Sequence, residues 1–278
     1  MKSKIPCIVL AGGVNAIPLY EGYRPGHKAL MDFHEKPFIE YVLEALVQSA
    51  HLKDHAGIVG PENEIKPVIM NYQFDFIPEG NTILESIFNA LRHYKNEELV
   101  LITNADLPLI SKEAIEEFVE KCFQEKSRYN DNVFISVVPK ENFTGNFSRL
   151  AKSTSRFRDV DVCHGNLFMV NPRVLNNKDA VNRINAIYNA RKSPIQSALA
   201  TGLRVGISYV LGVHLLHILT MRQMAQIAST RFGVGFIPVI SSYPEIAVDV
   251  DEPEDYKLIC DVLKERREAE GGRHEYES

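Results

Sequence analysis

The sequence is poor in cysteine, and the few cysteines that it has are not paired. Cys7, Cys122, Cys163 and Cys260 lie far apart, and no C-x-x-C motif occurs in the 278 residues. This spacing is typical of free thiols in an intracellular protein and argues against a zinc site. The G-x-S-x-G motif of serine hydrolases is absent as well, so the sequence offers no nucleophilic serine of that type.

Long apolar runs and an excess of positive charge are also absent. No segment reaches the roughly 18 apolar residues of a transmembrane helix, and the apolar run 5–11 is too short for a signal peptide. The net charge of −5 argues against nucleic acid as the main partner, although it allows a local basic pocket for an anionic small molecule. We therefore expect a cytoplasmic protein without stable membrane insertion. With 45% apolar residues, the chain can form a sizeable core.

The stretch IVLAGGVNAIPLYEGYRPGHK, residues 8–28, lacks both common phosphate-binding motifs. It contains no P-loop, and Gly12-Gly13 does not begin a dinucleotide-binding G-x-G-x-x-G motif. It nevertheless joins an apolar strand to a glycine pair and, further on, to Arg24 and Lys28. This arrangement suggests a third way of holding a phosphate group.

Strand patterns alternate with helix patterns over the first 140 residues. The sequence predicts strands at 5–11, 56–60, 73–77, 98–103 and 132–138, and helices at 37–50, 82–95 and 111–125. Thr82 or Asn81 can cap the second helix, and Ser111 the third. Such alternation predicts a mostly parallel sheet with helices on both faces. Since ligands bind beyond the carboxyl ends of such strands, we expect Gly12-Gly13 and Asp106 to share one crevice.

The second half of the chain is less regular. It predicts strands at 164–170 and 234–240, a helical region at 176–204 and a terminal helix at 253–267. For the apolar segment 205–219 we keep three alternatives: a core helix, an oligomer contact, or a face for a lipid-like substrate. We expect a single domain over residues 1–265, with a helical, partly apolar insertion at about 175–232 and a flexible tail at 266–278. The sequence is compatible with a homo-oligomer and does not determine the oligomeric state.

Three acidic residues stand out by their positions. Asp106 follows an apolar strand in LITNADLPLI, where an aspartate either forms a turn or a helix cap, or binds Mg²⁺. Asp249 and Asp251 alternate with valines in IAVDVDEPEDYKLI, so both carboxylates point to one face of a strand end. Capping of the helix that begins at Pro253 is the alternative for Asp251. Two neighbouring carboxylates repel each other unless a cation lies nearby.

Four short motifs occur in a fixed order along the chain. They are VLAGG at 9–13, R-x-G-x-K at 24–28, ADLPLI at 105–110 and DVDEPEDYKLI at 249–259. Together they resemble the nucleotidyltransferases of the molybdenum-cofactor guanylyltransferase-like type. These enzymes belong to a broader group with the glycosyltransferase-A-like fold of nucleotide-diphospho-sugar transferases. The resemblance spans roughly residues 5–140 and 160–265, and it implies a three-layer α/β/α, Rossmann-like α/β fold with a mostly parallel sheet.

The resemblance also implies a role for each matching residue. Lys28 would contact the β- and γ-phosphates of an NTP, while Asp106 and Asp251 would hold Mg²⁺, with Asp249 as the alternative ligand. Lys28, Asp106 and Asp251 would therefore be the catalytic residues. The nucleotide-binding residues would be Leu10, Ala11, Gly12, Gly13, Arg24, Gly80, Asn81, Ser86 and Asn104, and the acceptor-binding residues Gly165 and Asn166.

One loop departs from the pattern of the resembling family. Ten residues, 14–23, separate Gly13 from Arg24, so the loop is enlarged and the arginine is displaced. This departure affects the role of Arg24 more than that of Lys28. The sequence does not indicate what the added residues do.

The resemblance implies Mg²⁺-dependent transfer of an NMP from an NTP to a small acceptor, expected to carry a phosphate, with release of pyrophosphate. Two alternatives remain: a glycosyltransferase of the same fold that uses a nucleotide-sugar, and a non-catalytic nucleotide-binding regulatory protein. Lys28 favours the nucleotidyltransferase, because this lysine serves a triphosphate tail that a nucleotide-sugar lacks. The base of the NTP and the identity of the acceptor stay open.

Overall fold

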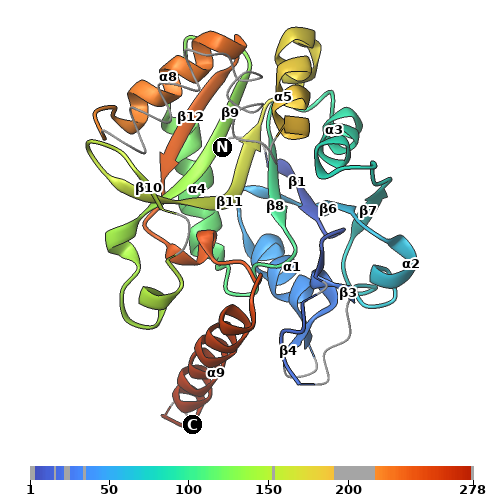
Figure 1. The fold of residues 1–278 in the computed structure, drawn as a ribbon. Helices are drawn as coiled ribbons and strands as arrows, with labels where there is room; N and C mark the ends of the chain where they lie inside the picture. Colours follow the sequence, from blue (N-terminus) through green and yellow to red (C-terminus); the bar gives the residue numbers. More distant parts are fainter. Residues whose placement is uncertain are drawn as a thin grey trace.

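A central, mostly parallel β-sheet organises the molecule (Figure 1). The computed structural model describes residues 4–15, 17–21, 26–33, 36–151, 154–190 and 217–276. The strand order is β12-β9-β11-β8-β1-β6-β7, and β10 pairs with β11 outside this path. The strands are β1 (Ile5–Leu10), β6 (Leu52–Val59), β7 (Phe74–Ile77), β8 (Val100–Asn104), β9 (Asn132–Pro139), β10 (Thr154–Arg156), β11 (Asp161–Val170) and β12 (Gly235–Ile240).

Most neighbouring strands in this sheet are parallel, and β11 is the exception. Strand β1 is parallel to both β6 and β8, and the pairs β6–β7 and β12–β9 are parallel too. Strand β11 runs antiparallel to β8, β9 and β10. The predicted mostly parallel sheet is therefore confirmed.

Helices cover both faces of the sheet, because the central strands are apolar on both sides. On one face, α1 (Phe38–Gln48), α4 (Lys112–Gln124) and α9 (Pro253–Tyr276) pack on a core that includes Val9. On the other face, α3 (Ile83–His93) packs on a second cluster that includes Ile8, and α8 (Met221–Phe232) on a third. The helix α5 (Lys178–Ala190) lies beside them, and the short α2 (Glu62–Ile65) follows β6 (Figure 1). The three-layer α/β/α architecture expected from the sequence is confirmed.

The predicted helix starts at α3 and α4 are confirmed by their caps. The Thr82 hydroxyl oxygen accepts a hydrogen bond from the backbone N–H of Glu85 at 3.1 Å. The Ser111 hydroxyl oxygen does the same for Ala114 at 3.2 Å. Each bond satisfies a backbone donor that the first helical turn leaves without a partner.

Some element boundaries differ from the sequence predictions. Strand β6 begins at Leu52, before the predicted 56, because Leu52 pairs with Ile5 although charged residues follow it. Helix α9 continues to Tyr276, beyond the predicted end at 267. Glutamate, arginine and alanine in this stretch favour helix, and no proline interrupts it. The flexibility of the segment 266–278 stays a prediction.

Part of the predicted helical insertion can be compared with the structure. Both α5 and α8 are helical, as expected for the segment at about 175–232. Most of the apolar segment, residues 205–216, lies outside the described residues, as does Arg24. No helix in the described part of the chain combines the length and the apolar character needed to cross a membrane.

The enlarged loop after Gly13 packs against the start of α9. Its ends form a small antiparallel pair of β2 (Val14–Asn15) and β3 (Gly26–His27). The side-chain amide of Asn15 donates to the backbone oxygen of Asp251 at 3.1 Å. The Tyr20 ring stacks on Tyr256 with ring centroids 4.6 Å apart. The loop thus contacts the acidic C-terminal motif, 236 residues away in sequence.

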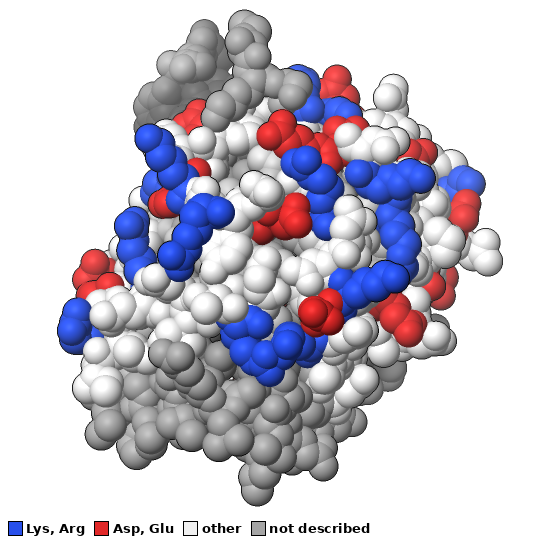
Figure 2. Space-filling view, turned by 90° about the horizontal axis from the view of Figure 1, so that it is seen from above, with Lys and Arg blue, Asp and Glu red and all other residues white. Residues whose placement is uncertain are grey.

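Charged side chains of both signs share the outer surface. On the face seen in Figure 2, Lys and Arg side chains alternate with Asp and Glu side chains across the part of the surface that the structure describes. This mixture accords with the net charge of −5, which contains no excess of basic residues.

Candidate active site

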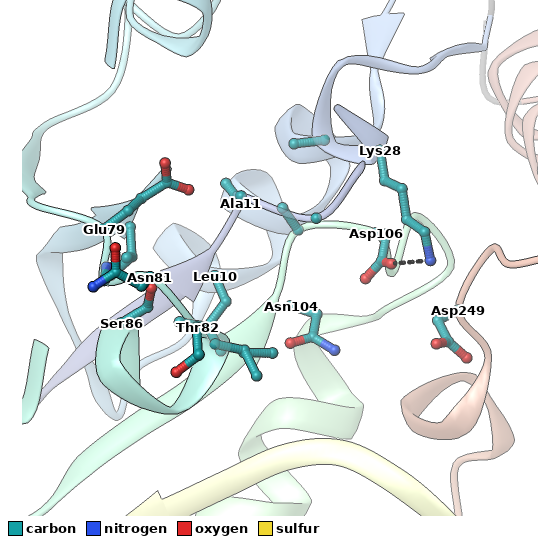
Figure 3. A pocket seen from close by; sticks show the side chains of 17 residues that line it. Leu10, Ala11, Lys28, Glu79, Asn81, Thr82, Ser86, Asn104, Asp106 and Asp249 are labelled. Atoms are coloured by element: carbon teal, nitrogen blue, oxygen red, sulfur yellow. Dashed lines mark hydrogen bonds and ion pairs between the residues drawn. The ribbon is translucent and has the colours of Figure 1, made fainter. Parts of the chain in front are cut away.

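A cavity of about 510 Å³ opens at the carboxyl ends of β1 and β8. The two strand ends are neighbours, because Leu10 pairs with Asn104 in the sheet, and the N–H of Ala105 donates to the Leu10 oxygen at 3.0 Å. The prediction that Gly12-Gly13 and Asp106 share one crevice is therefore confirmed. The predicted residues that line the cavity are Leu10, Ala11, Gly12, Gly13, Lys28, Gly80, Asn81, Ser86, Asn104, Asp106 and Asp249 (Figure 3).

Lys28 reaches from the end of the enlarged loop to two of the predicted acids. Its ammonium lies 3.2 Å from Asp106 Oδ2 and also forms an ion pair with Asp251 Oδ1. The backbone fixes the lysine, since its N–H donates to the Gly13 oxygen at 2.9 Å. Burial alone would lower the pKa of Lys28, but the charges of Asp106 and Asp251 outweigh burial and raise it. Lys28 is therefore a permanent cation at this end of the cavity.

Two of the three carboxylates around Lys28 are buried, which disfavours their ionised form. Burial raises the pKa of Asp106 by more than the nearby ammonium of Lys28 lowers it. Burial, and after it the charges of Asp106 and Asp251, raise the pKa of Asp249 to about 6. The Asp251 side chain is 61% exposed and lies at the rim. The three acids form a region of negative potential that favours cations.

The donor set fits a magnesium ion that is shared with a phosphate ligand. In the described part of the chain, no cluster of three or more His, Cys, Asp or Glu side chains could hold a metal ion on its own. Mg²⁺ does not require such a cluster, because it commonly uses one or two carboxylates together with substrate phosphates and water. Asp106 and Asp249 line the cavity, and Lys28 already holds Asp106 and Asp251 around one positive charge. Asp249 and Asp251 are therefore both candidates for the second carboxylate that would bind the metal together with Asp106.

The opposite end of the cavity is built on the start of α3. The backbone N–H of Gly80 donates to the Ser86 hydroxyl oxygen at 3.0 Å. A Cβ at Gly80 would lie 2.8 Å from the backbone carbon of Glu85 and 2.9 Å from the nitrogen of Ser86. Only glycine fits this close approach of two backbones. The segment before α3 is thus fixed against the helix.

The two predicted acceptor residues lie on β11, beside the cavity. The Asn104 amide donates to Asn166 Oδ1 at 3.1 Å, which connects Asn166 to the cavity wall. Gly165 is buried, and a Cβ there would lie 2.7 Å from Ile246 Cγ2. The structure therefore gives Gly165 a packing role, while binding of an acceptor by Asn166 stays a prediction.

Sequence reasoning missed three residues at the α3 end of the cavity. Glu79, Thr82 and Ile83 line it together with the predicted residues of the same segment. Their proximity to Gly80 and Asn81 in sequence was a usable indication for all three. Thr82 was recognised only as a helix cap.

Comparisons with known proteins agree on one family. The model of the MobA-like NTP transferase domain matches residues 7–165. A 2-C-methyl-D-erythritol 4-phosphate cytidylyltransferase of Clostridium beijerinckii is 30% identical over 126 residues, which are 42% of this chain and 52% of that protein. A probable molybdenum cofactor guanylyltransferase of Flavobacterium johnsoniae is 28% identical over 106 residues, 35% and 49% of the two chains. The chain thus spans about half the length of these curated relatives.

Solved structures are similar over more of the chain. A hypothetical transferase from Thermus thermophilus has a TM-score of 0.73 and 28% identity, covering 91% of this chain and 99% of its own. A 4-diphosphocytidyl-2C-methyl-D-erythritol synthase from Anaerococcus prevotii has a TM-score of 0.54 and 14% identity, covering 94% and 96% of the two chains, and it shows the fold alone. The matched segment 7–165 contains Gly12-Gly13, Lys28 and Asp106, and the resemblance predicted from the motifs is confirmed. The chain belongs to the MobA-like NTP transferase domain family.

Proposed function

We propose that the protein is a Mg²⁺-dependent nucleotidyltransferase that transfers an NMP from an NTP to a small phosphorylated acceptor. The observation that carries the proposal is the ion pair of Lys28 with Asp106, next to the glycine turn that follows β1. A cation and buried carboxylates at the carboxyl ends of parallel strands suit a metal-bound triphosphate.

The reaction requires positioning and charge neutralisation rather than a strong base. An anionic acceptor oxygen attacks the α-phosphorus, the bond between the α-phosphorus and the bridging oxygen breaks, and pyrophosphate leaves with the electron pair of that bond. The bound Mg²⁺ would neutralise negative charge on the phosphates, with Asp106 and either Asp249 or Asp251 as its protein ligands. An acceptor that is already ionised gives up no proton, so the chain needs no general base for this step.

The protein groups have separate tasks in this scheme. Gly12 and Gly13 present backbone N–H groups to the phosphates, and the lack of a Cβ permits their close approach. Lys28 exchanges its contact with Asp251 for the β- and γ-phosphates, where its charge opposes the growing charge of the leaving group. The wall formed by Asn104 and Asn166 is the proposed side of entry for the acceptor.

Two rival functions make different demands on the same cavity. A glycosyltransferase would bind a nucleotide-sugar, which carries only a diphosphate and therefore offers Lys28 no γ-phosphate to contact. A regulatory protein would bind the nucleotide without turnover. The burial of Asp106 and Asp249 beside each other would then destabilise the fold although no reaction required these acids. Lys28 and the two buried acids therefore favour the nucleotidyltransferase over both alternatives.

The test is pyrophosphate release from each of the four NTPs with Mg²⁺ and a panel of small acceptors, phosphorylated and not. We expect release with at least one NTP and a phosphorylated acceptor, and a loss of release when EDTA removes Mg²⁺. Turnover of a nucleotide-sugar without pyrophosphate would support the glycosyltransferase instead. If NTPs raise the thermal midpoint but no acceptor leads to release of pyrophosphate, the regulatory protein would be supported.

A further inference from the structure

A second cavity lies outside the candidate active site, between α1, the segment that joins β8 to α4, and α9. Its volume is about 430 Å³, and it shares no lining residue with the first cavity. Among the described residues, four cationic and two acidic side chains line it: Lys36, Lys112, Arg266 and Arg267 against Glu44 and Glu113. In a chain with a net charge of −5, this local excess of positive charge favours an anionic ligand.

The two acids of this cavity leave most of the positive charge uncompensated. Lys36 forms an ion pair with Glu44, and its ammonium lies 4.1 Å from the centroid of the Tyr41 ring. The second acid, Glu113, is exposed, so water weakens its interaction with the other charges. Lys36 and Glu44 therefore neutralise each other, and three further cations face the cavity.

Two of these three cations, Lys112 and Arg267, have no ion pair in the part of the chain that the structure describes. Lys112 lies in the first turn of α4, where a positive charge is unfavourable for the helix dipole. Arg267 lies near the Tyr41 hydroxyl: burial raises the pKa of Tyr41, and the charge of Arg267 opposes this rise. Neither helix stability nor an internal ion pair accounts for these two charges.

The third cation connects the cavity to the segment that follows Asp106. Arg266 Nη1 donates to the backbone oxygen of Leu109 at 2.7 Å, and Leu109 lies three positions after Asp106. The Arg266 side chain is 38% exposed. Because a guanidinium carries five N–H donors, Arg266 can hold the Leu109 oxygen and still donate to a ligand.

The same arginine also approaches the segment that leads to Asp249. Its Nη2 lies 3.8 Å from Oε1 of the buried Glu245, and this oxygen accepts a hydrogen bond from the Ser111 hydroxyl at 2.8 Å. Glu245 lies four positions before Asp249. A displacement of the Arg266 guanidinium would therefore alter contacts of both segments that carry candidate metal ligands.

We propose that this cavity is a regulatory site for a phosphate dianion, free or carried by a small molecule. The parallel N–H donors of an arginine match the oxygens of a phosphate, and Lys112 supplies a further positive charge. The bound phosphate draws the Arg266 guanidinium away from the Leu109 oxygen and from Glu245. This loosens the support of the segment after Asp106 and weakens nucleotide binding. The binding of phosphate is independent of the proposed function, whereas its effect on a nucleotide rests on it.

The first experiment titrates the protein with phenyl phosphate and with inorganic phosphate in a calorimeter. Sodium chloride keeps the ionic strength constant, so that general screening does not contribute. We expect saturable binding of both probes. Tighter binding of phenyl phosphate would identify a phosphate ester as the ligand, since Ile110 and Leu263 also line the cavity. Equal binding would identify free phosphate.

The variants Arg267→Gln and Lys112→Gln each remove one charge from the lining. The dissociation constant of both probes should rise about tenfold or more in each variant, the size expected for a lost hydrogen bond to a charged group. The matched control is Lys264→Gln, at an exposed lysine of the same helix α9 that lies outside the cavity. It should bind both probes like the unmodified protein. Unchanged binding in Arg267→Gln and Lys112→Gln would overturn the inference, because the probes would then bind elsewhere.

The second experiment measures the dissociation constant of the tightest-binding Mg²⁺–NTP complex with and without phenyl phosphate. The probe concentration is chosen to fill the second cavity of the unmodified protein but not that of Arg267→Gln. We expect the probe to weaken NTP binding about fivefold or more, the lower end of typical coupling between two sites. The effect should persist in Lys264→Gln and disappear in Arg267→Gln.

Two results of the second experiment would overturn the inference. If the probe weakens NTP binding equally in Arg267→Gln and in the unmodified protein, it competes inside the candidate active site. If it leaves NTP binding unchanged in the unmodified protein, the second cavity does not regulate the first. Neither result touches the proposed function. If no NTP binds at all, the proposed function fails, whereas the first experiment still decides whether the phosphate site exists.

Discussion

Lys28 Nζ lies 3.2 Å from Asp106 Oδ2, in a cavity whose negative side chains exceed its positive ones. The same ammonium pairs with Asp251, so one lysine neutralises part of the charge of two acids. Under the proposed function, Lys28 would thus occupy, in the free protein, the place of a divalent cation between these carboxylates. In the proposed function, the ammonium of Lys28 would move to the phosphates of a metal-bound triphosphate, and Asp106 and Asp251 would then be available to hold the metal.

Replacement of Lys28 by methionine should therefore destabilise the free protein and make it more responsive to metal. Unpaired buried carboxylates beside each other should lower the free energy of unfolding by about 1 to 3 kcal/mol. Millimolar Mn²⁺ or Mg²⁺ should restore part of this loss, because the metal binds only the folded carboxylates. The measurement is the thermal midpoint as a function of metal concentration.

The control for this variant is Lys53→Met, which removes an exposed lysine paired with Glu97, away from the cavity. Its midpoint should rise no more with metal than that of the unmodified protein. If Lys28→Met shows the same metal response as the control, the ammonium does not substitute for a cation.

Asp106→Asn should abolish metal-dependent turnover without unfolding the protein. The amide is isosteric with the carboxylate but binds Mg²⁺ weakly, and it no longer pairs with the charge of Lys28. We expect pyrophosphate release to fall by about 100-fold or more, the size typical of a lost electrostatic contact in the transition state. Asp54→Asn, at an exposed aspartate that pairs with Lys4, should keep full activity. Turnover in Asp106→Asn close to that of Asp54→Asn would exclude Asp106 from the reaction.

Much of the site follows from the sequence, because parallel strands place all their carboxyl ends at one edge. The strand before Gly12 and the strand before Asp106 were both apparent as apolar runs, so their convergence was predictable. Gly80 was also recognised, because the stretch around it resembles the family's segment at the start of a helix. These features depend on residues close together in sequence.

Other features depend on contacts that local sequence does not encode. Glu79 adjoins the recognised Gly80 in sequence, but its position over Gly12 depends on a contact between segments that lie far apart in the chain. The packing role of Gly165 follows from its closeness to Ile246, which lies 81 positions further along the chain. The enlarged loop gave no pattern at all, yet Asn15 joins it to the backbone of Asp251. Such long-range contacts appear only once the strands are placed.

Two glycine variants should separate folding from binding at the cavity. In Gly13→Ala the new Cβ would have Lys28 Cδ as its nearest neighbour, at 3.9 Å, so the fold should tolerate it. The methyl group would nevertheless enter the space next to the phosphates and weaken NTP binding. In Gly80→Ala the Cβ would meet the backbone of α3, and we expect a loss of stability of about 2 kcal/mol or more.

Chemical denaturation and NTP titration of both variants check this distinction. Gly13→Ala should match the unmodified protein in denaturation but bind NTPs about tenfold or more weakly, equivalent to about 1.4 kcal/mol. Gly80→Ala should unfold at a lower denaturant concentration. Unchanged NTP affinity in Gly13→Ala would mean that the phosphates do not approach this turn.

Asp249 gives the free protein a pH dependence whose sign can be stated. Its pKa is raised from 3.8 to about 6 in the folded state, first by burial and then by Asp106 and Asp251. A carboxyl group with a raised pKa binds its proton more tightly in the folded protein than in the unfolded one. Its contribution to stability is therefore complete below about pH 4 and is lost as the pH rises through about 6.

The variant Asp249→Asn should accordingly stabilise the metal-free protein at pH 7.5, where the unmodified side chain is a buried anion. The gain should be up to about 3 kcal/mol, because the pKa is raised from 3.8 to about 6 and each pKa unit corresponds to about 1.36 kcal/mol. The gain should shrink as the pH falls and vanish at about pH 4, where both side chains are neutral. Urea denaturation at a series of pH values in EDTA measures it. If the variant is equally stabilised at pH 7.5 and at about pH 4, the amide improves packing, and the ionised carboxylate does not destabilise the folded protein.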